Sequence, residues 1–324
     1  MEFSFSDRPC SLEKMKEISH LNTQFGINVT GSDLQAEQIK FKSGAGSLTI
    51  VNINNRHAKA SLVLQGGHLL SWQPNEEENV IWLSEDAIFS KEHSIRGGIP
   101  ICWPWFGAHP VNHSFPSHGY ARTSDWDVVE TKTLSDGSSL IVLQLLQDAV
   151  SEEYRARDVE LDLRVTVGKR LEMSLITRNA GNKAVTIGQA MHTYFYVSDI
   201  QNVILSGLEN QVYIDALDRW QRKNETNPIM IKAEVDRIYQ DTPEIPVYII
   251  DQAFKRQIKI RKQGSHSTVV WNPWIDKSER LGDMGKNGYK NMICVETGNV
   301  ADDVVMIEPE TEHSLSVCYE IESL

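Results

Sequence analysis

The sequence predicts an all-β fold, built as a large antiparallel sandwich or barrel. From Ser47 to the end of the chain, short apolar runs with a period of two residues follow one another closely. This alternation is typical of strands in a sheet with one solvated face. Glycine, proline, asparagine and aspartate separate the runs, as turns require. No long helical pattern follows the first 40 residues, and no repeat of fixed period is visible.

Residues 159–175 carry the clearest single signal, which is that of a β-hairpin. Apolar residues of one parity alternate with polar or charged ones in the first run: Val159, Leu161, Leu163, Val165 and Val167. The turn Gly168-Lys169-Arg170 leads into a second run of the same period that begins at Leu171. Two such runs joined by a short turn that contains glycine predict antiparallel pairing.

Runs of the same kind predict the other strands of the sandwich. In chain order they cover residues 47–54, 60–65, 80–83, 140–146, 184–197, 203–205, 212–216, 247–250, 257–261, 268–271, 292–295, 304–307 and 314–321. The tract 275–291, which is rich in glycine, aspartate and lysine, is expected to be a polar loop.

The domain organisation that we expect is a short N-terminal arm, residues 1–44, followed by one β-sandwich domain, residues 45–324. Ser11 is a suitable N-cap for a short helix over residues 12–18. Residues 26–38 then have the glycines and polar side chains of a loop or peripheral segment. The length of 324 residues is normal for a large all-β domain.

The net charge of −12, from 32 basic and 44 acidic residues, argues against nucleic acid or an anionic membrane as a partner. An anionic substrate would therefore need local arginine or lysine residues. The chain begins without the apolar core of a signal peptide, so we expect a cytoplasmic protein. Its four cysteines (Cys10, Cys102, Cys294 and Cys318) form no C-x-x-C pair, which favours free thiols over a cysteine metal site.

Two apolar strands each contain one residue that could carry protons. His192 lies within the run 191–200, and Glu296 lies within the run 292–299. A histidine in such a run is more often a hydrogen-bonded core residue than a catalytic one. A glutamate, however, is almost never fully buried without a partner. If the fold brings these two strands together, His192 and Glu296 would form a general acid–base pair.

Residues 95–122 interrupt the rhythm of strands with four prolines and four glycines. Such an irregular backbone is typical of the rim of a cleft. Arg96 begins this segment and Arg122 ends it. If both side chains enter one cleft, their forked donors suit a phosphate or a carboxylate. The alternative is two surface arginines on a packed loop.

Two further motifs have both functional and structural interpretations. The run Trp271-Asn272-Pro273-Trp274 could present an aromatic face to a sugar, although tryptophans more often fill a core. Asp236-Arg237 could contribute an acid to a site, or could be an ordinary surface ion pair. Phosphate-binding glycine loops, the H-E-x-x-H zinc motif and the G-x-S-x-G serine motif are absent from the sequence.

With these residues in view, the chain resembles the hexose-6-phosphate mutarotases, or glucose-6-phosphate 1-epimerases, of the aldose 1-epimerase superfamily. The motifs that carry the resemblance occur in the family's order over residues 45–322. They are R-G-G-I-P at 96–100 with the following W-P-W-F-G, H-G-Y-A-R at 118–122, M-H-T-Y-F at 191–195, D-R-I-Y at 236–239, W-N-P-W at 271–274 and N-M-I-C-V-E at 291–296. The resemblance implies an antiparallel β-sandwich of the galactose-mutarotase type that uses no metal or cofactor.

The resemblance also implies the role of each site residue. His192 would be the general acid and Glu296 the general base in opening and closing a hexose ring. Arg96 and Arg122 would contact the substrate, including its phosphate; Asp236 would hold sugar hydroxyls and His118 would line the pocket. The expected partner is a sugar phosphate, glucose 6-phosphate first, and the expected state is a monomer. A non-catalytic carbohydrate-binding protein and an epimerase of unphosphorylated aldoses are the alternatives.

Overall fold

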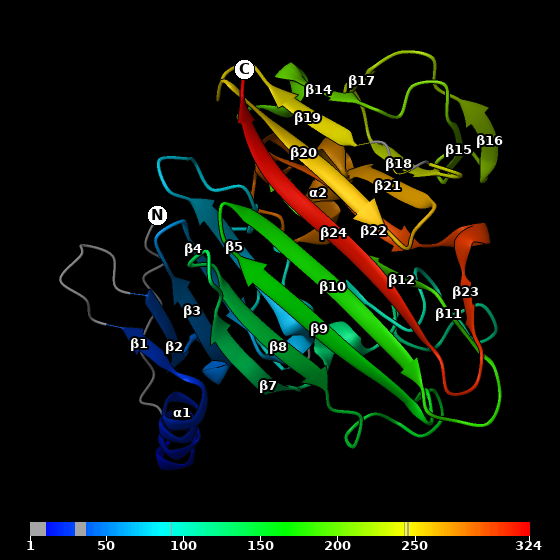
Figure 1. The fold of residues 1–324 in the computed structure, drawn as a ribbon. Helices are drawn as coiled ribbons and strands as arrows, with labels where there is room; N and C mark the ends of the chain where they lie inside the picture. Colours follow the sequence, from blue (N-terminus) through cyan, green and yellow to red (C-terminus); the bar gives the residue numbers. More distant parts are fainter. Residues whose placement is uncertain (1–10, 30–36, 92, 243, 245) are drawn as a thin grey trace.

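Two large antiparallel sheets pack face to face and form the body of the molecule (Figure 1). The computed structural model describes residues 11–29, 37–91, 93–242, 244 and 246–324. All pairings between its named strands are antiparallel. The prediction of an all-β antiparallel sandwich is therefore confirmed.

The first large sheet has nine strands. In spatial order these are β17 (Ile229–Met230), β14 (Val203–Ser206), β19 (Val247–Asp251), β20 (Arg256–Gln263), β24 (Glu312–Ser323), β10 (Arg170–Asn179), β9 (Val159–Val167), β8 (Ser139–Leu145) and β7 (Trp126–Thr133). The predicted hairpin is its β9–β10 pair, in which Val167 lies opposite Leu171. The apolar residues of β9 that share one parity are all buried, as that pattern requires.

The second large sheet carries the candidate site. Its order is β16 (Gln221–Asn224), β15 (Val212–Asp215), β18 (Val235–Tyr239), β21 (Ser267–Asn272), β22 (Met292–Asn299), β12 (Gln189–Met191) and β6 (Ile101–Cys102), and β13 (Tyr194–Tyr196) also pairs with β22. Two smaller sheets complete the fold. One contains β1 (Ile27–Val29), β2 (Glu37–Ser43), β3 (Thr49–Asn54), β4 (Ala58–Val63) and β5 (His68–Pro74), and the other pairs β11 (Val185–Ile187) with β23 (Val305–Ile307).

Strand β22 separates two environments. Ile293 and Val295 belong to the main core, together with Leu163 and Leu315 of the nine-stranded sheet. Successive side chains of a strand point to opposite faces, so Cys294 and Glu296 point away from that core. They enter a second region, where Cys294 packs among aromatic side chains such as those of Trp82, Tyr194 and Trp271. The candidate site thus lies on the face of the sheet turned away from the main core.

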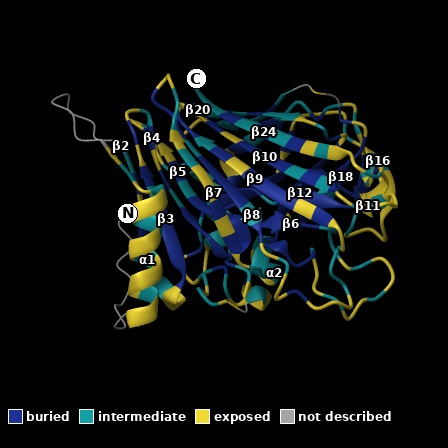
Figure 2. Cartoon of the chain, turned by 60° about the horizontal axis from the view of Figure 1, so that its bottom comes forward, coloured by how far each residue is buried: buried dark blue, intermediate teal, exposed yellow. Residues whose placement is uncertain are grey.

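The N-terminal helix was predicted correctly at its start, and the segment after it was not. Helix α1 spans Leu12–Phe25, and its cap Ser11 accepts a hydrogen bond from the backbone N–H of Lys14 at 3.1 Å. It lies on the outside of the molecule with no buried residue (Figure 2). Beyond it, β1 and the start of β2 replace the two ends of the expected loop 26–38, whose residues 30–36 lie outside the described part of the chain; β2 pairs with β3 and buries Phe41 in the main core. The boundary between arm and domain remains a prediction.

Three local expectations need correction. The tract 275–291 was expected to be a polar loop but contains most of the helix α2 (Trp274–Leu281). At the first residue of this helix, the backbone N–H of Trp274 donates to Asn272 Oδ1 at 2.9 Å. The predicted strand 80–83 makes only isolated bridges, from Ile81 and Leu83. The predicted strand 184–197 divides into β11, β12 and β13.

Within the described residues, no helix is long and apolar enough to cross a membrane.

The packing of β9 leads to a test of the fold. Leu163 is 0% exposed in the main core, whereas Leu217 is 48% exposed. Leu163→Ala should lower the free energy of unfolding by about 2–5 kcal/mol, through lost burial and the cavity that remains. The control Leu217→Ala should change it by no more than about 0.5 kcal/mol. Urea denaturation measures both, and equal effects would contradict this placement of the core.

Candidate active site

The pairing of strands around β22 brings His192 and Glu296 face to face. Met191 of β12 lies opposite Thr297, and Tyr194 of β13 lies opposite Cys294. The ladder is interrupted between these two pairs, but its register is the same on both sides. Continued across the gap, that register sets His192 opposite Glu296. Directly opposed side chains on one face of an antiparallel pair lie close together.

The His192 and Glu296 side chains are in contact. His192 Nε2 lies 3.3 Å from Glu296 Oε1, and the two side chains are 12% and 1% exposed. Outside the regular ladder, the backbone N–H of His192 donates to the carbonyl of Pro100 at 3.0 Å, which anchors the residue. Among the described residues, the buried atoms His192 Nδ1 and Glu296 Oε2 have no hydrogen-bond partner. The proximity that a general acid–base pair requires is present, and its catalytic role remains a prediction.

Burial moves both members of the pair toward their neutral forms. It lowers the pKa of His192 well below the usual value, and the cations Arg122 and Arg96 lower it further. It also raises the pKa of Glu296 well above the usual value, with the help of the nearby Asp236 carboxylate. Two forms of the pair have the same number of protons: a protonated Glu296 beside a neutral His192, and a Glu296 carboxylate beside a His192 imidazolium. The pair can therefore give and accept one proton in either form.

Aromatic rings hold the His192 imidazole in place. The Tyr194 ring stacks on it with a centroid distance of 4.9 Å and an interplanar angle of 10°. The Trp271 ring meets it edge-on at 6.0 Å. Trp271 is buried in the aromatic cluster beside the candidate site, so it fills a core as tryptophans usually do, and its role toward a sugar remains a prediction. Tyr194 was not singled out from the sequence. Its position two residues after His192 in the predicted strand, where alternate side chains share one face, is the signal that could have identified it.

Arg96 is already part of a polar network. Its Nε donates to Asp283 Oδ1 at 3.0 Å, and its Nη1 donates to the hydroxyl oxygen of Tyr194 at 3.1 Å. These partners raise the pKa of Arg96 although burial opposes the rise. Asp283 follows α2, in the tract that the sequence marked only as a polar loop. An anion that binds Arg96 must therefore share it with a carboxylate.

Arg122 has a different environment. Its Nη2 donates to the backbone carbonyl of Ser117 at 2.7 Å, and no carboxylate within the described part of the chain pairs with it. Its charge reaches the centre of the site, since it lowers the pKa of His192 and of His118. Arg96 affects the same two histidines. Both predicted arginines therefore act electrostatically on His192 and His118. Of the two, Arg122 is the one whose charge no described carboxylate neutralises.

His118 is held in one tautomer. Its Nδ1 accepts the backbone N–H of Gly107 at 3.3 Å, and the Cys102 thiol lies 3.5 Å from the same atom. Burial raises the pKa of Cys102 to about 12, so the thiol keeps its proton and can only donate to Nδ1. Burial and the two arginines lower the pKa of His118 to about 3. The ring is therefore neutral and carries its proton on Nε2.

The turn that presents His118 requires glycine at the next position. Gly119 has φ +73°, and a Cβ built there would lie 1.9 Å from the carbonyl oxygen of Trp103. His118 itself has φ +63°, which is uncommon for a residue with a side chain. The His118 ring lies 5.8 Å from the His192 ring. This strained turn is therefore next to the candidate acid–base pair.

Asp236 lies across the sheet on β18, opposite Trp271. Its Oδ2 is 3.7 Å from Lys277 Nζ of α2, and the same ammonium lies 3.1 Å from Glu234. Burial is the main cause that raises the pKa of Asp236. The charge of Asp236 raises the pKa of Glu296, so the two carboxyl groups are electrostatically coupled. Lys277 could not be singled out from the sequence, because α2 itself was not predicted.

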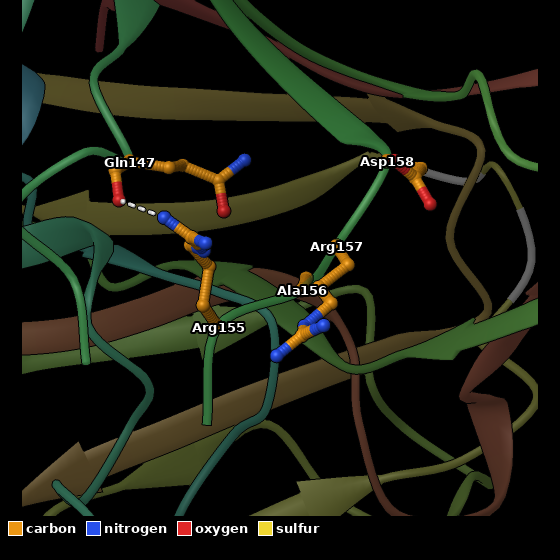
Figure 3. Close-up of a pocket in the computed structure, with 5 residues that line it drawn as sticks. All are labelled: Gln147, Arg155, Ala156, Arg157 and Asp158. Carbon is orange, nitrogen blue, oxygen red and sulfur yellow. Dashed lines mark hydrogen bonds between the residues drawn. The ribbon is translucent and has the colours of Figure 1, made fainter. Parts of the chain in front are cut away.

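A separate hollow on the surface contains none of these residues. Gln147, Ala156 and Asp158 line it together with Arg155 and Arg157, in the connection from β8 to β9 (Figure 3). Arg155 Nη1 donates to the backbone carbonyl of Gln147 there at 3.3 Å. The contact between His192 and Glu296 therefore lies outside this hollow.

Fold and site together define a class of protein: a β-sandwich enzyme with a buried histidine–glutamate pair on one sheet face. The family model of the aldose 1-epimerases matches residues 49–320. The chain belongs to the aldose 1-epimerase family.

Individual relatives point to one branch of that family. The chain is 35% identical over 267 residues to a protein of Escherichia coli (strain K12) named putative glucose-6-phosphate 1-epimerase, which covers 82% of this chain and 88% of the relative. It is 34% identical over 280 residues to a protein of Cenchrus ciliaris with the same name, covering 84% and 83%. The predicted resemblance is therefore confirmed at the level of the family and these relatives.

Solved structures confirm the type of fold. A putative mutarotase (YeaD) from Salmonella typhimurium superposes with a TM-score of 0.81 at 29% identity, over 95% of this chain and all of that one. A galactose mutarotase-like protein from Clostridium acetobutylicum has a TM-score of 0.68 at 13% identity, over 89% and 99%, and so shares the fold. The expected sandwich of the galactose-mutarotase type is correct.

The environment of His118 predicts its titration. Because its pKa is lowered to about 3, the ring should stay neutral between pH 5 and pH 8. Nitrogen-15 NMR of labelled histidine should show one constant Nε2–H tautomer over this range. The variant His118→Gln identifies the resonance by its loss. A midpoint near the usual histidine pKa of about 6.5 would contradict the described burial.

Proposed function

We propose that this protein interconverts the α and β anomers of a hexose 6-phosphate, with glucose 6-phosphate as the first candidate. The observation that carries the proposal is the 3.3 Å contact between His192 Nε2 and Glu296 Oε1 in a buried site. Ring opening at an acetal carbon needs one acid and one base within hydrogen-bond reach of the same carbon. The names of the relatives support the choice of a phosphorylated hexose.

In the proposed reaction, the Glu296 carboxylate removes the proton from the C1 hydroxyl while the His192 imidazolium protonates the ring oxygen O5. The C1–O5 bond breaks and leaves an open-chain aldehyde. Rotation about C1–C2 exposes the other face of the carbonyl carbon. O5 then attacks C1 and returns its proton to His192, and Glu296 returns its proton to O1. The pair ends with the proton distribution with which it began.

The ionic form of the pair that begins this reaction competes with the neutral form favoured by burial. Arg96 and Arg122 both lower the pKa of His192, whereas of these two only Arg122 acts on Glu296. A substrate phosphate that binds these arginines would weaken the field that lowers the pKa of His192, and so would favour the imidazolium that the reaction needs.

Recognition of the phosphate would fall mainly to Arg122, because Arg96 shares its charge with Asp283. The neutral His118, with its proton on Nε2, can donate to a sugar oxygen. Asp236 can accept hydrogen bonds from sugar hydroxyls, since its side chain is 30% exposed. We further propose that the protein acts as a cytoplasmic monomer on this small substrate.

Glu296→Gln tests the acid–base role. The amide keeps the size of the side chain but cannot take up a proton, so the enhancement of anomer exchange should fall by about 10²–10⁴-fold. Polarimetry of fresh α-glucose 6-phosphate, or NMR exchange spectroscopy, measures this rate, and circular dichroism checks the fold. Activity like that of the wild type in the variant would reject the assignment. Saturable binding without any catalysis in the wild type would instead favour a carbohydrate-binding protein.

Arg122→Gln tests phosphate recognition. Loss of a charge-assisted hydrogen bond should raise KM for glucose 6-phosphate by roughly tenfold or more and leave free glucose almost unaffected. Arg157→Gln is the matched control, because Arg157 is 67% exposed and lies in the separate hollow. Equal losses for glucose and glucose 6-phosphate would show that Arg122 does not recognise the phosphate.

A further inference from the structure

Three metal-binding side chains of different chemistry converge at the candidate site. They are His192, Cys294 and Glu296, and one donor atom of each lies within 4.8 Å of the other two. Cys294 and Glu296 occupy alternate positions on β22, so their side chains share one face of the strand. His192 reaches them from the neighbouring chain segment, between β12 and β13. From the sequence we expected no cysteine metal site, because the cysteines form no C-x-x-C pair and His192 lies about a hundred residues before the other two donors.

The spacing of two of these donors matches a tetrahedral ion. Zinc binds imidazole nitrogen and carboxylate oxygen at about 2.0–2.1 Å, so two such ligands in a tetrahedral site lie about 3.3 Å apart. His192 Nε2 and Glu296 Oε1 are 3.3 Å apart. A thiolate at about 2.3 Å from the same ion would be roughly 3.6 Å from either ligand. Cys294 Sγ lies within 4.8 Å of both other donors, so a shift of roughly 1.2 Å would bring it to that separation.

A second observation points to a ligand at this place. Glu296 is 1% exposed, and its Oε2 atom has no hydrogen-bond partner among the described residues. A buried carboxylate oxygen without a partner is costly, and a cation would satisfy it. Of the three donor residues, His192 is the one whose side chain is partly exposed, at 12%.

We propose that Zn²⁺ or a chemically similar soft divalent cation binds His192, Cys294 and Glu296 and thereby blocks the site. The thiolate and imidazole select zinc over hard cations such as Mg²⁺, which prefer oxygen ligands. The Cys294 thiol gives its proton to solvent when the metal binds. The bound ion coordinates the lone pair of His192 Nε2 and the carboxylate of Glu296. Neither group can then take up a proton from the substrate. The inhibitory part of this proposal rests on the proposed function, whereas the binding part does not.

Co²⁺ substitution and direct Zn²⁺ binding test the site without any activity assay. Reduced wild-type protein should bind one Zn²⁺ per chain at the site by equilibrium dialysis and, with Co²⁺, show a thiolate-to-cobalt absorption band in the near ultraviolet. Cys294→Ala should lose the band and weaken Zn²⁺ binding by at least tenfold, and Glu296→Gln should also weaken it. Cys318→Ala is the control, because this thiol lies on the nine-stranded sheet.

The outcomes separate this proposal from the proposed function. A cobalt band that survives in Cys294→Ala, or Zn²⁺ binding equal in wild type and Cys294→Ala, would overturn the metal site. If Cys294→Ala does not fold, as circular dichroism would reveal, Cys294→Ser replaces it with the same expectations. Binding with unchanged anomer exchange at saturating Zn²⁺ would overturn inhibition alone. Specific Zn²⁺ binding by a protein without any anomerase activity would leave the site standing and reject the proposed function.

Discussion

The register of β12 and β13 along β22 is the constraint on which the candidate site depends. One pairing continues on both sides of a short break, and the break is where His192 meets Glu296. Residues of the opposite parity, Ile293 and Val295, join the main core. A slip of one residue would exchange the two sets and bury the wrong side chains on each face. The same hydrophobic packing that stabilises the sandwich therefore fixes the geometry of the acid–base pair.

Electrostatics at the site reflects a balance between burial and charge. Burial favours neutral forms of His192 and Glu296; the charge of Arg122 lowers the pKa of both, and the charge of Asp236 raises the pKa of Glu296. The site contains a further carboxylate, that of Asp283, which pairs with Arg96. Asp283 offsets the charge of Arg96, whereas no carboxylate among the described residues pairs with Arg122. A phosphorylated ligand would change that balance, and so would couple phosphate recognition to the protonation of the pair.

The sequence was sufficient for the fold class, because strand alternation comes from the same burial that forms the sheets, as in β9. It was also sufficient to nominate His192 and Glu296, but not to show that they touch, since pairing between distant strands is a tertiary property. Helix α2 was missed because it is only 8 residues long and lies within a polar tract. Its absence from the prediction hid Lys277 and Asp283. Tyr194 and Cys294 were overlooked because aromatic and thiol side chains in a strand are usually core residues.

The central claim is that His192 and Glu296 act together on the anomeric centre of one sugar. A crystal structure of the protein with glucose 6-phosphate tests it most directly. The account predicts O1 and O5 within hydrogen-bond distance of Glu296 and His192, with the phosphate against Arg122. A sugar bound elsewhere, such as in the hollow beside Gln147, or one whose anomeric carbon lies out of reach of both side chains, would contradict it.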